Sequence, residues 1–213
     1  LPRIVTVQPR GRGYPRPMRH IVYVAPFPMP TTLRFARALA SLDNVCLTGV
    51  FQTAPPPGSG FADVELVRDA LDPDIVGAAV SRLAERHGDI HRLLGILENA
   101  QDCLAAVREA LCIDGIRPDT ALRFRDKGVM KDALRTAGLP CARHTRVRSA
   151  GDAWAFVERV GYPIVIKPPA GAGCRATLRA DHPQGLARAL AELRPSPERE
   201  ALAEEFLGVA PAW

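Results

Sequence analysis

The sequence is poor in lysine, in aromatic residues and in long apolar runs. Only three of its 28 basic residues are lysines, Lys127, Lys131 and Lys167, and aromatic residues make up 6% of the chain. No apolar run approaches the roughly 20 residues of a membrane-spanning helix. No apolar segment of signal-peptide length follows the N-terminal arginines. The sequence therefore favours a cytoplasmic protein with no membrane partner.

Cysteine usage points to the same compartment. The five cysteines are scattered along the chain, and no two of them form a C-x-x-C pair. An odd number without paired spacing argues against a disulfide framework and against a zinc site. Most of these cysteines are best interpreted as small buried side chains in a reducing environment.

The positive charge is concentrated in one stretch. The net charge of the chain is +5, whereas residues 117–148 hold nine basic and three acidic residues, a net charge of +6. Such a stretch binds either nucleic acid or the phosphates of a small nucleotide. Aromatic residues are not interleaved with the basic ones, and RNA-recognition and zinc-finger signatures are missing. We expect no nucleic-acid partner. Nucleic-acid binding stays an alternative class of function, which a steep dependence of DNA or RNA affinity on salt concentration would support.

Strands and helices are expected to alternate from Met18 to about residue 116. Residues 1–17 are rich in Arg, Pro and Gly and predict a disordered tail, with Met18 as the hypothetical natural start. One helix is especially well marked, because Asp72 can cap it and Pro73 suits its first position. The alternation predicts a parallel sheet in an α/β, Rossmann-like domain, 18–116. The dinucleotide fingerprint G-x-G-x-x-G does not follow the first strand, which argues against nicotinamide or flavin binding. The expected strands are 21–24, 45–50, 64–67 and 90–97, and the expected helices are 33–40, 73–87 and 101–111.

A second domain, 117–213, is expected to be α+β with an antiparallel sheet. Its first short helix would be capped by Asp119 or Thr120, and a second helix would end at Gly138 with Pro140 just beyond. The expected helices are 120–125, 126–137, 153–160 and 184–193, and the expected strands are 145–147, 164–167, 176–180 and 201–207.

Three short motifs in this second domain carry chemistry. The first is Arg123-Phe-Arg-Asp-Lys127-Gly-Val-Met-Lys131. The second is the strand Ile164–Lys167, which delivers one lysine to a loop containing Gly171 and Gly173. Glycines let backbone N–H groups turn toward an anion, but the spacing is not that of a Walker A loop. The third motif is Glu204-Glu-Phe-Leu-Gly208. The second motif is weak by itself, since glycine turns between strands are common.

Together and in this order, the three motifs resemble the ATP-grasp superfamily over roughly residues 18–208. The first hundred residues look like the pre-ATP-grasp domain of that superfamily, and the runs 24–29, 32–37 and 94–98 look most like its amino-acid ligase, carnosine-synthase-like branch. The resemblance implies ATP and Mg²⁺ as cofactors and a small carboxylate or amino acid as substrate. It implies an ATP-dependent carboxylate–amine ligase that acts through an acyl phosphate.

The resemblance also implies a set of binding residues. Lys127 matches a helix-start lysine that contacts phosphates, and Lys167 matches a strand lysine that bridges phosphate oxygens. Glu204 matches the residue that accepts from the adenine amino group. Phe206 and Leu207 match the hinge that reads the adenine edge. The mobile loop over the triphosphate corresponds to Gly171, Ala172, Gly173 and Cys174, and two candidates for the substrate side are Glu98 and Arg175.

Several of these residues have ordinary alternatives. Lys127 could be a solvated lysine at a helix end, and Lys167 could simply pair with a nearby carboxylate. Arg175 could touch phosphate or only decorate the loop. Glu98 is expected at the end of a strand, where parallel sheets bind ligands. Cys174 is better explained by packing than by nucleophilic chemistry.

The sequence departs from the ATP-grasp pattern after Gly208. The magnesium-binding carboxylates, the asparagine and the arginine of the later, C-terminal subdomain are not found in residues 209–213. This predicts a fragment or truncated product that alone binds ATP poorly and does not catalyse. The alternative is a non-catalytic nucleotide-binding module or a degenerate paralogue. Whether the chain forms a homodimer is left open.

Overall fold

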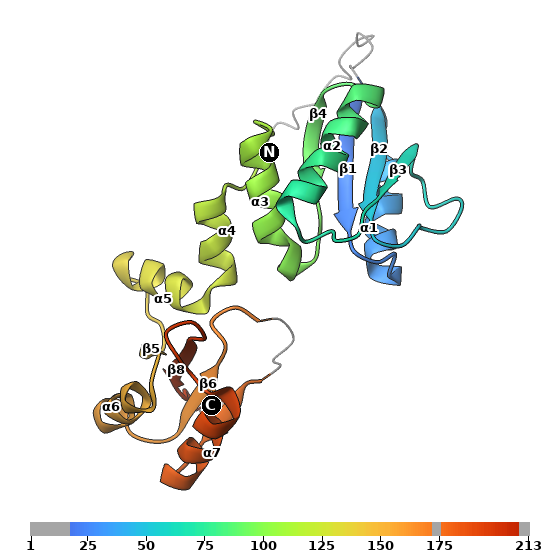
Figure 1. Ribbon diagram of the computed structural model, residues 1–213. Coiled ribbons are helices and arrows are strands. Elements are labelled where there is room, and N and C mark those ends of the chain that lie inside the picture. Colours follow the sequence, from blue (N-terminus) through green and yellow to red (C-terminus); the bar gives the residue numbers. More distant parts are fainter. Residues whose placement is uncertain (1–17, 172–175, 209–213) are drawn as a thin grey trace, which may run out of the picture. The chain divides into compact units, whose positions relative to one another are not determined.

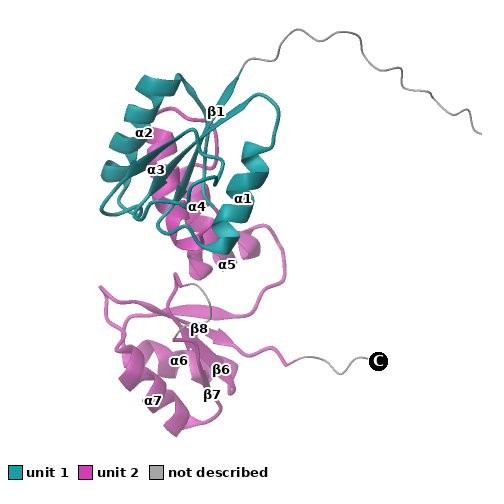
Figure 2. Cartoon of the chain, turned by 90° about the vertical axis from the view of Figure 1, so that its right-hand side faces the viewer, with its two compact units in different colours: residues 1–95 teal, residues 96–213 magenta. Residues whose placement is uncertain are grey.

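The computed structural model describes residues 18–171 and 176–208, which fall into two compact units that divide between Gly95 and Ile96 (Figure 1, Figure 2). The tail predicted at 1–17 and the predicted loop residues Ala172, Gly173, Cys174 and Arg175 lie outside the described residues. None of the helices in the described ranges combines the length and the apolar character needed to cross a membrane.

The first unit is built on a four-stranded parallel sheet, as the sequence predicts. The strands follow the order β3-β2-β1-β4, and each neighbouring pair is parallel. The central strand β1 is apolar on both faces, which is the pattern of a strand covered by helices on both sides. The elements of this unit are β1 (Arg19–Ala25), α1 (Pro30–Ala40), β2 (Val45–Phe51), β3 (Asp63–Leu66), α2 (Pro73–His87) and β4 (Ile90–Leu94).

Helices α1 and α2 cover opposite faces of this sheet (Figure 2). Ala36 of α1 packs in one core cluster with Ile21 and Tyr23 of β1. The start of α2 is as predicted: Pro73 is its first residue, and the Asp72 side chain accepts hydrogen bonds from the amides of Asp74 and Ile75. The cap satisfies two N–H groups that have no partner inside the helix.

Charged side chains fasten α2 to the edge strand β3. Arg86 Nη2 donates to Glu65 at 2.6 Å, and Arg86 Nε donates to Asp63 at 2.8 Å. His87 Nε2 lies 2.9 Å from the same Asp63 carboxylate. These hydrogen bonds, that of His87 first and that of Arg86 second, lower the pKa of Asp63 to about 2.

The second unit contains an antiparallel sheet, which confirms the predicted α+β character. Its strands follow the order β5-β8-β6-β7. Helix α3 belongs to this unit and packs on α4, while the domain boundary predicted near residue 117 stays a prediction. The elements are η1 (Glu98–Ala100), α3 (Gln101–Ala110), α4 (Pro118–Arg125), α5 (Lys127–Thr136), β5 (His144–Val147), α6 (Ala150–Val160), β6 (Ile164–Lys167), β7 (Leu178–Ala180), α7 (Pro183–Leu193) and β8 (Ala201–Glu205).

The two faces of the antiparallel sheet differ in chemistry. One face packs Ile164, Ile166 and Ala203 against Phe156 of α6 and Leu186 of α7. Side chains alternate along a strand, so the residues between them point to the other face. That second face carries Arg146 of β5, Lys167 of β6, and Leu202 and Glu204 of β8. The sheet is therefore apolar toward α6 and α7 and largely charged on its opposite face.

One predicted cap is wrong. Helix α4 begins at Pro118, its N-cap is Arg117, and no side chain caps it, so neither Asp119 nor Thr120 acts as the cap. Proline at the first helical position explains the difference, because its ring presets the helical φ angle and it has no N–H that needs a partner. Helix α5 begins at Lys127, one residue after the predicted start at residue 126, and Asp126 is its N-cap.

We predict that Asp63→Asn flattens the acid dependence of stability. The folded pKa of about 2 lies below the ordinary value of 3.8, so the contribution of Asp63 is complete above pH 3.8 and is lost as the pH falls through about 2. Urea unfolding across this window should show a smaller loss of stability in the variant than in the wild type. Asp43→Asn, at an exposed carboxylate, is the control and should keep the wild-type slope. Identical slopes for all three proteins would contradict the prediction.

Candidate functional site

All three lysines of the chain gather in one place. Lys127 and Lys131 lie one turn apart on α5, and Lys167 ends β6. The Lys127 ammonium donates to the carbonyl of Gly171 at 2.9 Å. The Lys167 ammonium donates to Glu204 Oε2 at 2.8 Å, and the Lys131 ammonium lies 3.7 Å from Glu204 Oε1. A helix start, a strand end and a neighbouring strand thus converge on a single carboxylate and a single loop.

The register of the sheet brings Lys167 to Glu204. Val165 is directly opposite Glu204, and Lys167 is directly opposite Leu202. Lys167 and Glu204 are therefore diagonal neighbours on the same face, a separation that long side chains can bridge. In the structure, Lys167 pairs with a nearby carboxylate, which is the ordinary alternative given for it above. Its partner is the very residue that the family resemblance implies for adenine.

Glu204 has one oxygen that lacks a hydrogen bond. The residue is only 8% exposed. Oε1 is buried and has no hydrogen-bond partner among residues 18–171 and 176–208, because Lys131 at 3.7 Å forms an ion pair that is too long for a hydrogen bond. A buried carboxylate oxygen costs free energy until a donor reaches it. The site therefore offers an acceptor to a ligand N–H group, such as the adenine amino group.

The first turn of α5 is held to the loop that follows β6. The Asp126 side chain accepts from the amides of Gly128 at 2.8 Å and Val129 at 2.9 Å. The Lys127 amide donates to the carbonyl of Pro169 at 3.0 Å. Burial would raise the pKa of Asp126, but hydrogen bonds from the Val129 amide and from Arg146 outweigh burial and lower it. A helix N-terminus that carries a lysine is a favourable environment for an anion.

The predicted hinge residues Phe206 and Leu207 lie beyond β8. This strand ends at Glu205 and does not extend to residue 207 as expected. The Phe206 amide donates to the carbonyl of Pro163 at 3.1 Å, so only its carbonyl can read an adenine edge without breaking that bond. The Arg179 guanidinium lies 4.1 Å from the centre of the Phe206 ring, a cation–π contact. Leu207 is exposed.

Glu98 is not at a strand end as expected. Strand β4 ends at Leu94, and Glu98 opens the short helix η1. Its carboxylate lies 3.7 Å from Arg125, in a side-chain cluster that also includes Asp102. The expected strand, 90–97, is too long by three residues. The structure therefore gives Glu98 a neighbour in α4 instead of a place at the edge of the parallel sheet.

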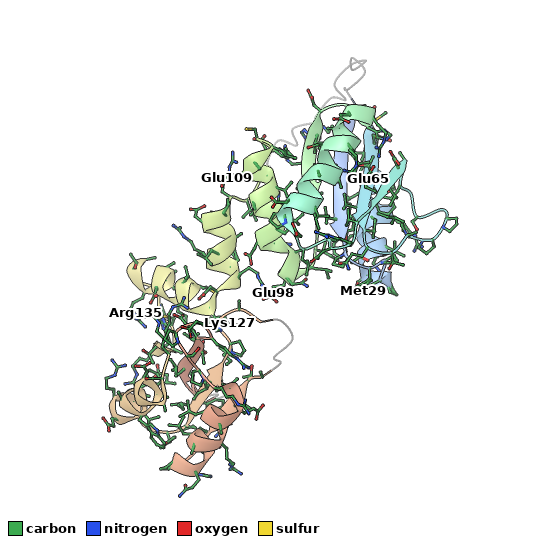
Figure 3. The ribbon with its side chains drawn as sticks, viewed as in Figure 1. Met29, Glu65, Glu98, Glu109, Lys127 and Arg135 are labelled. Atoms are coloured by element: carbon green, nitrogen blue, oxygen red, sulfur yellow. The ribbon has the colours of Figure 1, made fainter. Side chains whose placement is uncertain are left out.

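The sequence also indicates Lys131 as a site residue, although it was not among the predicted ATP-binding residues. It stands four positions after Lys127, which places both side chains on one face of a helix. The scarcity of lysine pointed to the same three positions. Figure 3 labels Lys127 at one end of α5 and Arg135 at the other (Figure 3). Arg179, by contrast, could not have been found, because its contact with Phe206 joins two segments through the folded chain.

The basic stretch 117–148 is largely neutralised in the fold. Seven of its nine basic side chains lie within ion-pair distance of a carboxylate. A nucleic acid would have to compete with these pairs for phosphate contacts. The seven are Arg123, Arg125, Lys131, Arg135, Arg143, Arg146 and Arg148.

The described ranges contain no group of three or more His, Cys, Asp or Glu side chains that could hold a metal ion. The prediction of Mg²⁺ rests on the family resemblance.

Comparison with known sequences points to an ATP-binding domain. Residues 126–207 match the family model described as the carbamoyl-phosphate synthase L chain, ATP binding domain. The carbamoyl phosphate synthase large chain of Streptomyces coelicolor is 30% identical over 94 residues, which cover 44% of this chain and 8% of that protein. The formate-dependent phosphoribosylglycinamide formyltransferase of Burkholderia mallei is 34% identical over 116 residues, 53% of this chain and 27% of that protein.

Solved structures share the fold over nearly all of this chain. An L-amino acid ligase from Bacillus licheniformis matches with a TM-score of 0.69 at 18% identity, covering 90% of this chain and 45% of that one. The N5-carboxyaminoimidazole synthetase of Staphylococcus aureus, complexed with ADP, matches with a TM-score of 0.69 at 15% identity, covering 92% and 49%. This chain spans less than half of each of these solved structures and about a quarter or less of the two sequence relatives. The chain thus has the fold that its resemblance to the ATP-grasp superfamily implies, and its residues 126–207 match an ATP-binding domain model.

Proposed function

We propose that this chain supplies the part of an ATP-dependent carboxylate–amine ligase that binds the triphosphate and the adenine of ATP. The observation that carries the proposal is the convergence of all three lysines on Glu204 and on the loop after β6. Ammonium groups stabilise the negative charge of a transferring phosphoryl group, and a partly buried face strengthens that effect. In a chain whose other 25 basic residues are arginines, this clustering favours a specific chemical use of lysine.

Each end of the nucleotide has a partner in this arrangement. Lys127 and Lys131 face the phosphates from α5, and Lys167 reaches them from the end of β6. Glu204 accepts the adenine amino group through the oxygen that has no hydrogen bond in the described structure. Lys167 binds Glu204 Oε2 at 2.8 Å, whereas the oxygen proposed for the adenine amino group is Oε1.

The reaction that the family resemblance implies has two steps. The substrate carboxylate attacks the terminal phosphorus of ATP, the bond to the bridging oxygen breaks, and ADP leaves. The acyl phosphate is then attacked by an amine, and inorganic phosphate leaves as the C–N bond forms. The lysines contribute charge neutralisation and positioning. Mg²⁺, when bound together with ATP, would supply further charge neutralisation.

The amino-acid ligase type of substrate rests mainly on the runs 24–29, 32–37 and 94–98. The fold alone does not separate the branches, since an L-amino acid ligase and an N5-carboxyaminoimidazole synthetase match equally well. The alternative is a non-catalytic nucleotide-binding module or degenerate paralogue. ATP turnover with and without amino acids, by the chain and by any longer protein that contains it, distinguishes the two.

The scarcity of lysine allows the proposed site to be tested by chemical modification. An amine-acetylating reagent can modify only Lys127, Lys131, Lys167 and the chain N-terminus. ATP should slow acetylation of all three lysines, whereas adenosine should protect Lys127 less because it brings no phosphate to α5. Peptide mass spectrometry after short exposures reads each position separately. Equal acetylation with and without ATP at every lysine would contradict the proposed site.

Substitution of individual lysines tests their contribution to ATP binding. Lys127→Met and Lys167→Met should each weaken ATP binding by about ten-fold or more, since a hydrogen bond to a charged group contributes roughly 1.5–3 kcal/mol. Isothermal titration or an NMR titration measures the dissociation constants. Arg135→Met is the matched control, because it removes a positive charge from the other end of the same helix. Equal losses in the control and in the lysine variants would mean that only net charge matters.

A further inference from the structure

Arg146 joins the two elements that carry the proposed nucleotide site. It stands on β5 with its side chain partly buried, on the charged face of the sheet. Nη2 donates to Asp126 Oδ1 at 2.8 Å, and Nη1 donates to Glu200 Oε2 at 2.7 Å. One planar guanidinium thus bridges a carboxylate at the start of α5 and a carboxylate just before β8.

The contact with Asp126 acts on the first turn of α5. The oxygen that Arg146 holds, Oδ1, is the same atom that accepts the amides of Gly128 and Val129. Orienting that oxygen therefore orients the cap. Lys127 lies within this turn, between the cap and Gly128, and Lys131 follows one turn later. The directions of both ammonium groups depend on where α5 begins.

Gly128 leaves room for this contact. A Cβ atom at position 128 would lie 3.1 Å from Nη2 of Arg146 and 3.1 Å from Oδ1 of Asp126. Both distances are tighter than ordinary van der Waals contacts. A Cβ at this position would therefore require the guanidinium or the carboxylate to move by a few tenths of an ångström. The close approach of Arg146 from β5 therefore favours glycine at position 128 of the first motif.

The contact with Glu200 extends the bridge to β8. Glu200 immediately precedes β8, which carries Glu204, and its other oxygen accepts Arg148 Nε at 2.6 Å. Arg148 therefore shares Glu200 with Arg146, but in the described structure it forms no hydrogen bond with Asp126. Arg146 on β5 and Arg148 just after it thus form a matched pair. Of these two, Arg146 is the one that contacts Asp126 at the start of α5.

We propose that Arg146 is a positioning residue that sets the phosphate affinity of the site by acting through Asp126 on Lys127. This rests on the proposed function, since it assumes that Lys127 binds phosphate. A lysine cannot replace Arg146, because a single ammonium does not match two carboxylates in the way that a planar fork does. The adenine end of the site is held separately, by the register of β6 and β8.

The test compares Arg146→Gln and Arg146→Lys with the control Arg148→Gln. Dissociation constants for ATP and for adenosine are measured by NMR titration on the whole chain. Both Arg146 variants should weaken ATP binding by about ten-fold, within the range seen for contacts in one network, and leave adenosine binding unchanged. Arg148→Gln should leave both constants near wild type. Thermal unfolding of all variants shows whether each remains folded.

A double-mutant cycle separates positioning from general destabilisation. If Arg146 acts through Lys127, then Arg146→Gln should have little further effect on ATP affinity in a Lys127→Met background. An undiminished effect in that background would overturn the inference, and so would a wild-type ATP constant in Arg146→Gln. If Lys127→Met itself leaves ATP binding unchanged, the proposed function fails instead.

Amide hydrogen exchange provides a readout that needs no nucleotide. Arg146→Gln should speed exchange at Gly128 and Val129, whose amides bond to Asp126, while Arg148→Gln should not. Unchanged exchange at both amides in Arg146→Gln would overturn the inference even if ATP binds too weakly to titrate.

Discussion

The site depends on one buried carboxylate placed between two ammonium groups. Glu204 is almost fully buried, and a buried charge is tolerated only when an opposite charge and hydrogen bonds compensate for the lost water. Lys167 supplies the hydrogen bond, and Lys131 supplies a second positive charge at a longer distance. This requirement fixes the face on which Lys167 must emerge from β6 and the face that α5 must turn toward the sheet. The resulting group keeps one acceptor free in the described structure.

The fold meets this requirement through the alternation of side chains in the antiparallel sheet. Ile164 and Ile166 enter the core with α6 and α7, which leaves Lys167 on the opposite face. A slip of one residue in the pairing of β6 with β8 would move Lys167 into the apolar core. The apolar face thus protects the register, and the register brings Lys167 to Glu204. Stability and binding chemistry in this unit are two consequences of the same strand pairing.

Local signals in the sequence predicted the parts of the structure that depend on neighbouring residues. Asp72 and Pro73 marked the start of α2, and the alternation of elements indicated a parallel sheet followed by an antiparallel one. Contacts between distant segments were beyond such signals. The bridge from Arg146 to Asp126 and Glu200 spans three elements, and the Phe206 amide bond to Pro163 depends on how β8 ends. Glu98 was misplaced because an apolar run continued past the true end of β4. The site assignments for Lys127, Lys167 and Glu204 came from the family resemblance and stay predictions.

A crystal structure of the chain with a non-hydrolysable ATP analogue tests the central claim most directly. The account predicts the adenine amino group within hydrogen-bond distance of Glu204. It places the phosphates against Lys127 and Lys167. A nucleotide bound elsewhere, or one bound here with no lysine at its phosphates, would contradict the account.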